Sequence, residues 1–222
     1  NSDLTQIPPG SNNTTSVNWT RMDNSSISGQ TQVSALAVTK ANPANRLYVA
    51  RSPQGYLTRV DNANTGNPAG VDIGAAIPTG YISSVAVNPT DGNKVFVVFS
   101  NYNLASLWYS SDAGATWADV EGNLAGANGP SCQSVTIVPS GATTTYYLGT
   151  STGLYSTTSL SGTATVWAQE GASSIGNVVV SFLDSRASDE VVIVGTHANG
   201  VYSNVGGGAL QTTAAPTVNS PI

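Results

Sequence analysis

The sequence predicts an all-β fold, a β-propeller of four-stranded antiparallel blades, from three observations. Charged residues make up only 9% of the 222 residues, and Gly, Ser, Thr and Asn occur in nearly every segment. This composition is typical of a turn-rich β protein. No segment has the apolar spacing of an amphipathic helix. The third observation is a strand pattern that recurs along the chain, which predicts about four blades.

An apolar strand begins each repeat. "ALAV" at 35–38 recurs as "SVAV" at 84–87, "SVTI" at 134–137 and "VVSF" at 179–182, so successive starts lie 49, 50 and 45 residues apart. A turn rich in Pro, Asn, Asp or Ser follows each strand and leads to a second one. The second strands are "RLYVA", "KVFVVF", "TYYLG" and "EVVIVG". This regular spacing favours a repeat architecture over a sandwich.

Third and fourth strands complete the repeat unit. The predicted third strands are 56–61, 106–112, 153–158 and 200–204, and two repeats continue with Trp-led fourth strands at 117–122 and 167–172. The first repeat has a weaker fourth strand at 70–75. Four short strands in every ~45 to 50 residues match the period of a propeller blade. Uncharged, β-branched strands are expected where neighbouring blades cover both faces of a sheet.

The turn between the third and fourth strands of the second repeat carries a spaced motif, "SSDAGATW" at 110–117. A short Asp accepts hydrogen bonds from turn amides, Gly tolerates positive φ, Thr begins the next strand, and Trp packs beneath the hairpin. Ser110, Asp112, Gly114, Thr116 and Trp117 match the Asp-box, so the hairpin resembles the bacterial neuraminidase repeat. We interpret it as a structural clasp.

A second resemblance concerns the end of the repeat region. The segment 182–204 is similar to the last blade of secreted Asp-box or sortilin-like propeller proteins, and the resemblance as a whole covers about residues 17–204. It implies a propeller fold. It says little about activity, because one fold serves many functions.

The repeats divide the chain into segments. Residues 1–24 are expected to be the end of a preceding blade or a closing outer strand, with a strand at 18–23. The blades are predicted at about 25–76, 77–126, 127–176 and 177–204, and 205–222 has the composition of a linker. Either the strand at 18–23 closes a four-bladed ring, or the chain is the C-terminal part of a larger propeller.

The larger ring is the favoured interpretation, because the resembling families build rings of about six to eight or more blades. It predicts open blade edges and exposed apolar faces, which a missing region, another chain or a second copy must cover. Two copies that together form an eight-bladed assembly are a further alternative.

Charge and composition exclude several function classes. The net charge is −5 and the seven basic residues are scattered, which excludes nucleic acid as the primary partner. No apolar run approaches the ~20 residues of a membrane span. The single cysteine, Cys132, allows no disulfide within the chain and is expected to be a small core residue.

Export is expected for this protein, which would be secreted or at the cell surface. Charges are few, Ser, Thr and Asn are many, and N-x-S/T triplets begin at Asn12, Asn13, Asn18 and Asn24. The chain starts at Asn1 rather than Met, so we expect a mature, trimmed or excised product.

Ligands of propellers usually bind on the face formed by the loops between strands two and three and by the blade-to-blade connections. The loops between strands two and three carry Arg51, Asn101, Tyr102, Asn103, Thr196, His197 and Asn199. The blade-to-blade connections carry Tyr81, Asn128 and Gln133. Aromatic and amide side chains together suit a sugar or a peptide. The alternative is a solvated rim.

Metal and cofactor sites are not predicted. His197 is the one histidine, so neither a multi-histidine metal cluster nor a Ser-His-Asp triad can form around a second histidine. It is expected to hydrogen-bond within its loop. Asp61, Asn62 and Asn64 could bind calcium, but their spacing matches no EF-hand loop.

Catalysis is possible only in limited forms. The sialidase resemblance would require three arginines on one carboxylate, but of Arg21, Arg46, Arg51, Arg59 and Arg186 only Arg51 is placed on the ligand face, and the Phe/Tyr-Arg-Ile-Pro signature is absent. A xyloglucanase-like hydrolase needs two facing carboxylates. The acidic residues form no obvious pair: Asp72, Asp119, Glu121 and Glu170 lie on or just after outer strands, and Asp91, Asp184, Asp189 and Glu190 lie at turns of the opposite face.

The sequence therefore predicts a non-catalytic extracellular module for protein or glycan recognition or surface assembly. The enzymatic alternative is the C-terminal part of an Asp-box glycoside hydrolase, xyloglucanase-like or sialidase-like, whose catalytic residues lie largely outside this chain. A third class is an assembly subunit whose open edges bind other chains.

Overall fold

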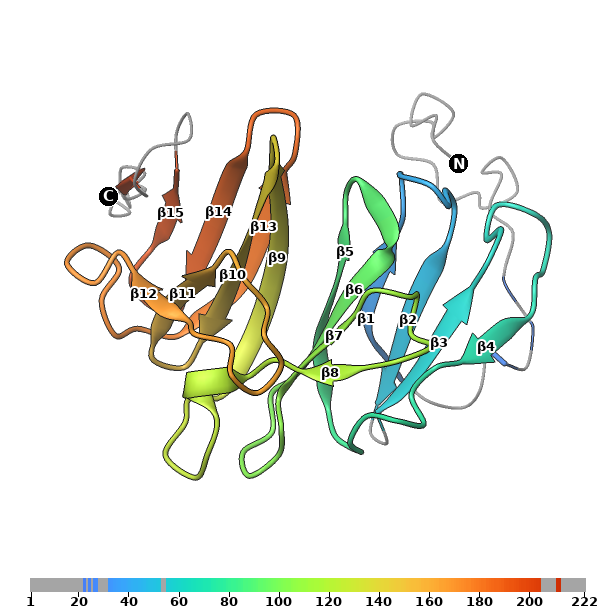
Figure 1. Ribbon diagram of the computed structural model, residues 1–222, viewed down its shortest axis with the longest axis horizontal. Coiled ribbons are helices and arrows are strands. Elements are labelled where there is room, and N and C mark those ends of the chain that lie inside the picture. The colour runs from blue at the N-terminus through green and yellow to red at the C-terminus, as the bar shows by residue number, and fades with distance from the viewer. Residues whose placement is uncertain are drawn as a thin grey trace, which may run out of the picture.

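Four antiparallel sheets of four strands each form the molecule (Figure 1). The computed structural model describes residues 22, 24, 26–27, 32–52, 55–204 and 211–212. Blade 1 consists of β1 (Gln32–Val38), β2 (Leu47–Ser52), β3 (Tyr56–Val60) and β4 (Gly70–Asp72), and blade 2 of β5 (Ile82–Asn88), β6 (Asp91–Phe99), β7 (Leu107–Ser110) and β8 (Ala118–Asp119). Blade 3 consists of β9 (Cys132–Ser140), β10 (Thr143–Thr150), β11 (Gly153–Thr157) and β12 (Ala168–Glu170), and blade 4 of β13 (Val180–Arg186), β14 (Val191–Thr196), β15 (Val201–Ser203) and β16 (Gln211–Thr212).

The predicted all-β propeller architecture is confirmed. The first strand of every blade packs on the first strand of the next, so that β1 lies against β5, β5 against β9 and β9 against β13. In Figure 1, β5 and β9 meet near the middle of the view, with blades 1 and 2 on one side and blades 3 and 4 on the other. Neighbouring blades cover the faces of the inner strands, which is in keeping with the low share of charged residues.

A β-bulge at the same place in every first strand sets the register of the repeats. The extra residues are Ser34, Ser83, Gln133 and Ser181. Counted from the bulge, Leu36, Val85, Val135 and Leu183 occupy one position. The predicted alignment of the fourth repeat, which set Val179 level with Ser134, is wrong by three residues. The structure places Phe182 level with Ser134, and the apolar run "VVVSFL" hides this shift because it fits a strand in either register.

Each blade has two apolar faces. We call the face toward the preceding blade the leading face and the face toward the following blade the trailing face. In blade 2, Val85 and Val97 of the leading face pack on blade 1, while Phe96 and Val98 of the trailing face pack on blade 3. A third cluster joins blades 3 and 4. The core is therefore a series of layers between blades, where burial of apolar side chains stabilises the stack.

Hydroxyl groups connect the first strands of blades 2, 3 and 4. Leu183 N–H donates to Ser134 Oγ at 3.0 Å, and Val135 N–H makes the equivalent, longer contact with Ser84 Oγ at 3.5 Å. Thr136 Oγ1 and Ser185 Oγ lie 2.7 Å apart. These contacts show which positions of neighbouring blades face each other near the axis.

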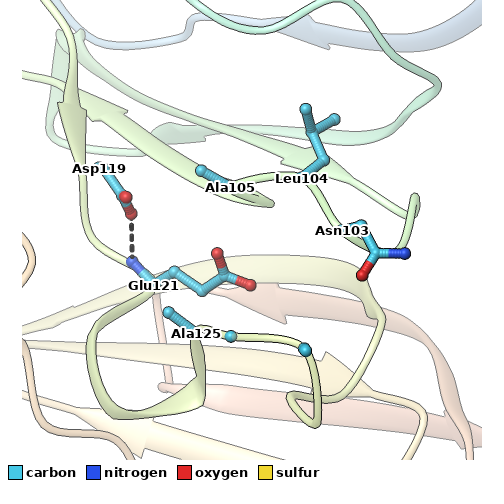
Figure 2. Close-up of a pocket in the computed structure, with 8 residues that line it drawn as sticks. Asn103, Leu104, Ala105, Asp119, Glu121 and Ala125 are labelled. Atoms are coloured by element: carbon cyan, nitrogen blue, oxygen red, sulfur yellow. Dashed lines mark hydrogen bonds between the residues drawn. The ribbon is translucent and has the colours of Figure 1, made fainter.

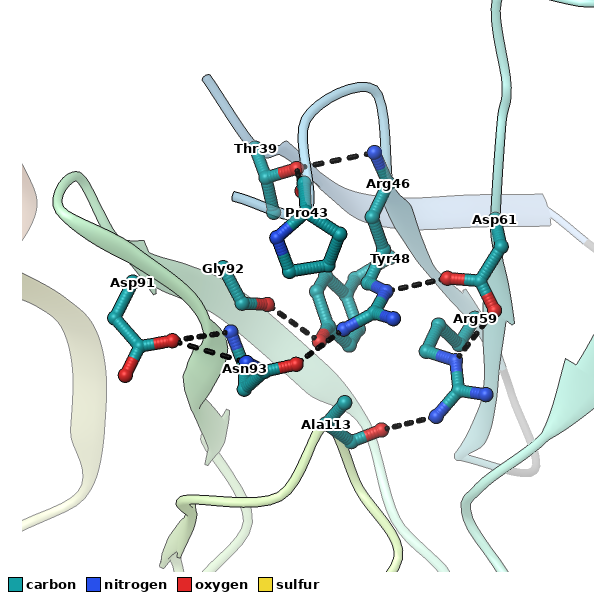
Figure 3. A network of polar contacts seen from close by, with 10 residues as sticks. All are labelled: Thr39, Pro43, Arg46, Tyr48, Arg59, Asp61, Asp91, Gly92, Asn93 and Ala113. Atoms are coloured by element: carbon teal, nitrogen blue, oxygen red, sulfur yellow. Dashed lines mark hydrogen bonds and ion pairs between the residues drawn. The ribbon is translucent and has the colours of Figure 1, made fainter. Parts of the chain in front are cut away.

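A polar network fastens blade 1 to blade 2 (Figure 3). The Arg46 guanidinium pairs with Asp61 and donates to Asn93 Oδ1 at 2.8 Å. Arg59 donates to the Ala113 carbonyl at 2.9 Å, and the buried Tyr48 hydroxyl donates to the Gly92 carbonyl at 3.0 Å. Both guanidinium groups are thus paired with Asp61 and hydrogen-bonded to blade 2. We interpret the network as structural.

The hairpin between β7 and β8 holds the motif at 110–117. Asp112 accepts hydrogen bonds from the Thr116 amide at 2.8 Å and the Thr116 hydroxyl at 2.6 Å, and Ser110 Oγ accepts from the Gly114 amide at 2.8 Å. Gly114 has φ +85° and lies directly against Ile73. The Trp117 indole N–H donates to the Ile73 carbonyl at 2.9 Å. The hairpin of blade 2 thus also clasps the outer edge of blade 1.

We expect the Asp112 clasp to make stability depend on acid pH. Hydrogen bonds from the side chain and backbone of Thr116 lower the pKa of Asp112 from 3.8 to about 2. A carboxyl with a depressed folded-state pKa contributes stability above its unfolded pKa, and this contribution is lost as the pH falls from about 4 toward about 2. Urea unfolding at pH 5 and pH 2.5 should show a larger acid-induced loss in the wild type than in Asp112→Asn. An equal loss in both proteins would contradict the assignment.

The end of the chain completes blade 4. Gln211 and Thr212, which lie in the segment expected to be a linker, pair with Ser203 and Tyr202 as β16. The edge of β15 is thus occupied by β16, where a closing N-terminal strand would have to lie. That predicted strand at 18–23 falls outside the described residues except for Met22. The described residues contain no helix that is long and apolar enough to cross a membrane.

Cys132 begins β9 as a fully buried free thiol, in keeping with a core residue. It lies in the apolar layer between blades 2 and 3. Burial raises the pKa of its thiol well above the ordinary value, so the thiolate is disfavoured.

Candidate functional site

A groove opens on blade 2 at the end where the β6–β7 loop meets the connection from β8 to β9 (Figure 2). We call it the blade 2 groove. Its volume is about 390 Å³. One wall comes from the β6–β7 loop and the other from the segment after β8, which includes a 3₁₀ turn, Gly122–Leu124. The lining residues are Asn103, Leu104, Ala105, Asp119, Glu121, Ala125, Gly126 and Ala127.

Two carboxylates lie in this groove, and both are engaged by the backbone. Asp119 Oδ1 accepts from the Glu121 amide at 2.9 Å, and Glu121 Oε2 accepts from the Ser106 amide at 2.9 Å. Glu121 is 5% exposed, and this burial raises the pKa of its carboxyl. Asp119 thus shapes the turn after β8, and Glu121 ties that turn to the start of β7. The pair gives the groove an acidic wall.

The same place on blade 1 holds a smaller hollow of about 180 Å³. Asp72 occupies the strand position of Asp119 and likewise accepts from an amide two residues on, that of Gly74, at 2.9 Å. In blade 3 the position belongs to Gln169, whose amide donates to Asn177 Oδ1 at 2.7 Å. The connection after β12 is thus bridged by a side chain. Blades 1 and 2 thus each carry a hollow at this place, and that of blade 2 is the larger of the two.

The predicted ligand-face residues do not gather in one site. Asn103 lines the blade 2 groove, and the adjacent Tyr102 is 65% exposed. Asn101 accepts from the Tyr81 amide at 2.6 Å and so fixes the loop beside the groove. Arg51 lies on blade 1, where its Cζ atom is 5.3 Å from the centre of the Tyr56 ring. Its guanidinium donates a hydrogen bond to Thr58 Oγ1.

The remaining candidates stabilise loops of other blades. Asn199 donates to the Tyr202 hydroxyl at 2.8 Å. The exposed His197 bonds the Val179 carbonyl through its backbone amide. Thr196 Oγ1 donates to the Gly200 carbonyl, and Gln133 Nε2 to Ser131 Oγ, each at 2.6 Å. Asn128 belongs to the loop after the 3₁₀ turn and lines a separate, more open hollow. The blade 4 candidates thus form hydrogen bonds that hold their own loops, and none of them lines the blade 2 groove.

Sequence reasoning did not assign Asp119 and Glu121 to a shared site. Both were placed on or just after an outer strand, but their proximity to Asn103 depends on how the β6–β7 loop folds back beside β8. The alternation "D-V-E" at 119–121 puts both carboxylates on one side of an extended segment, which is the one sequence signal available. Among the described residues, no group of three or more His, Cys, Asp or Glu side chains is placed to hold a metal ion.

Comparison with known proteins supports the architecture. A scan against models of protein families finds no match, and a search of curated proteins finds none. Among solved structures, the chain is similar to the GH74 enzyme NkGH74 of Niastella koreensis, with a TM-score of 0.57 and 17% identity over 81% of this chain. The fold is a β-propeller. It is also similar to YCF48 in its complex with D1 peptide, with a TM-score of 0.50 and 13% identity over 81% of this chain.

The propeller match is partial in length. The aligned region covers 30% of the NkGH74 chain and 53% of the YCF48 chain, so this chain matches only part of each of them. At these identities the likeness establishes the fold and assigns no residue a role.

Proposed function

We propose that this chain is a non-catalytic, extracellular propeller module that recognises a protein or glycan partner through the blade 2 groove. The observation that carries the proposal is an open groove lined by Asn103, two acidic side chains and small apolar residues, with the exposed Tyr102 next to Asn103 in the same loop. An aromatic ring at the rim supplies stacking area, and amides and carboxylates supply directional hydrogen bonds.

The state of the two carboxylates favours binding over hydrolysis. Asp119 and Glu121 are two residues apart on one segment and each is held by a backbone amide. A glycoside hydrolase places two carboxyl groups about 5 to 9 Å apart on opposite sides of the scissile bond. Two acids on one wall of a groove do not bracket a substrate in this way.

A peptide ligand is consistent with the acidic wall, because a cationic side chain could pair with Asp119. YCF48, which shares the fold, was solved with D1 peptide bound. Export of the protein is supported by its composition, with 9% charged residues and a series of N-x-S/T triplets. Kinship with Asp-box proteins is supported by the hydrogen-bonded hairpin at 110–117.

Binding should be tested with peptide and glycan arrays, followed by titration calorimetry on the strongest ligand found. Tyr102→Ala should weaken binding about ten-fold or more, because exposed tyrosines at the rim of a groove often supply much of the contact energy. The control is Tyr56→Ala, which removes an exposed tyrosine from the blade 1 hollow and should leave affinity unchanged. Equal affinity of wild type and Tyr102→Ala would exclude this groove as the site.

The enzymatic alternative is that the chain is part of a glycoside hydrolase. The similarity of the fold to that of a GH74 enzyme makes it the second candidate. Incubation with xyloglucan, followed by an assay for new reducing ends, tests it. Hydrolysis that is lost in Asp119→Asn would overturn the non-catalytic proposal.

A further inference from the structure

The three interfaces between blades repeat the same contacts at the same positions. The register places Tyr48, Phe96, Tyr147 and Ile193 at one trailing-face position. The first three pack against the next blade. On the leading face, Val85, Val135 and Leu183 share the position of Leu36 and are all buried. A trailing face of this type is therefore built to receive a leading face of this type.

The two end faces also carry apolar side chains, and the part of the chain that the structure describes leaves them exposed. On the leading face of blade 1, Leu36 is 59% and Val38 is 60% exposed. On the trailing face of blade 4, Phe182 is 63% and Ile193 is 38% exposed. Leu36 and Ile193 repeat positions that are apolar in the internal interfaces, whereas Phe182 stands where blades 2 and 3 have Ser84 and Ser134. Large apolar side chains that gather on an exposed face mark an interaction surface.

We infer that these end faces are docking surfaces for each other, and that a second copy of this chain occupies them head to tail. Such a contact would continue the series of interfaces inside the chain. Each internal interface joins a trailing face to a leading face. The exposed trailing face of blade 4 and the exposed leading face of blade 1 are the matching halves of such an interface.

The internal contacts predict which residues meet. Ser84 of blade 2 contacts Val135 of blade 3, and Ser134 of blade 3 contacts Leu183 of blade 4. The register gives Phe182 the position of Ser84 and Ser134, and gives Leu36 the position of Val135 and Leu183. Phe182 of one copy therefore lies against Leu36 of the other. Two apolar side chains replace a hydroxyl–amide contact at this seam.

The register also gives the place of Asp184 in this pairing. Thr136 contacts Ser185 across the interface between blades 3 and 4. Asp184 has the position of Thr136, and Val38 has the position of Ser185, so Asp184 of one copy approaches Val38 of the other. The exposed Lys40 follows Val38 by two residues, beyond the end of β1.

A head-to-tail contact uses two different surfaces on each copy, so it closes into a ring or continues as a filament. Two copies of four blades would give eight, which lies within the range of known propellers. Turn residues of blades 1, 2 and 4, among them Val38 and Arg186, line a hollow of about 420 Å³. Leu36, Phe182 and Ile193 do not line it and stay exposed within one copy.

Sedimentation velocity over a range of concentrations tests the inference. The wild type should form particles of two or more copies that dissociate toward 22.6 kDa on dilution. Phe182→Asp and Leu36→Asp should each weaken self-association at least ten-fold. Val166→Asp, a matched change at an exposed valine between β11 and β12, should behave as the wild type.

Mixing the two end-face variants makes the test directional. The Phe182→Asp protein keeps an intact leading face and the Leu36→Asp protein keeps an intact trailing face. An equimolar mixture should therefore form a mixed dimer, although each variant alone stays a monomer. A wild type that remains at 22.6 kDa up to about 200 µM would overturn the inference. Self-association that both variants leave unchanged would overturn it as well.

Discussion

Replacing Gly122 with alanine should destabilise the protein by about 3 kcal/mol or more. Gly122 has φ +59°, and a Cβ atom there would lie 1.8 Å from the carbonyl oxygen of Thr165. The surrounding segment cannot move freely, because Asn123 is hydrogen-bonded to both the amide and the carbonyl of Trp167. The Trp167 indole in turn donates to the Val120 carbonyl. Urea unfolding followed by tryptophan fluorescence measures the loss.

Gly141→Ala is the matched control for this change. Gly141 has φ +57°, but a Cβ atom there meets nothing within 4 Å. Its replacement should cost only the backbone strain of a left-handed residue, about 1 kcal/mol. An equal loss of stability in both variants would contradict the close approach of Gly122 to the Thr165 carbonyl.

Phe96→Ala should cost about 3 to 5 kcal/mol, since the side chain is fully buried between blades 2 and 3. Its ring lies 4.8 Å from that of Tyr109 and 5.4 Å from that of Tyr146, measured between centroids. The truncation would leave a cavity in the layer that joins the two halves of the molecule. Denaturant unfolding with a fitted m-value is the measurement.

Phe182→Ala provides the comparison at an end face. Phe182 is exposed in a single copy, so at concentrations where the chain is a monomer the loss should be below about 1 kcal/mol. A loss as large as that of Phe96→Ala would mean that the trailing face of blade 4 is buried in the monomer. That result would contradict both the open end face and the docking inference.

The strand order and the blade count could be predicted from the sequence because the same strand pattern occurs four times along the chain. Alternating apolar strands with Pro, Asn and Gly turns identify the first three strands of each blade, and Trp117 and Trp167 mark two of the fourth strands. The physical cause is that every blade must bury two faces against neighbours, so the same positions stay apolar in each repeat.

Three features could not be predicted, each for a different reason. Strand β16 has only two residues within a Gly-, Ala- and Thr-rich tail, which is too short for a periodic signal. The bulge at Ser181 shifts the fourth repeat, and a bulge leaves no mark in an apolar run. The blade 2 groove depends on the packing of two loops, so neither Asp119 nor Glu121 stands out in the sequence.

The candidate site and the end faces suggest a division of tasks within the fold. The loops of blade 2 carry the groove, while the strands of blades 1 and 4 present unused interface positions. Binding at the groove and self-association at the end faces involve different residues. The Tyr102→Ala and Phe182→Asp variants therefore test the two proposals separately.

Docking at the end faces requires a trailing face of blade 4 that is open in a single copy, and cysteine labelling tests this directly. The chain has one natural cysteine, Cys132, whose buried thiol should react slowly. Maleimide labelling of the Phe182→Cys variant is measured at high dilution, with the wild type as the reference. The account predicts rapid modification of one thiol per chain in the variant. Labelling as slow as that of Cys132 would show that the face is covered within one copy and would contradict the account.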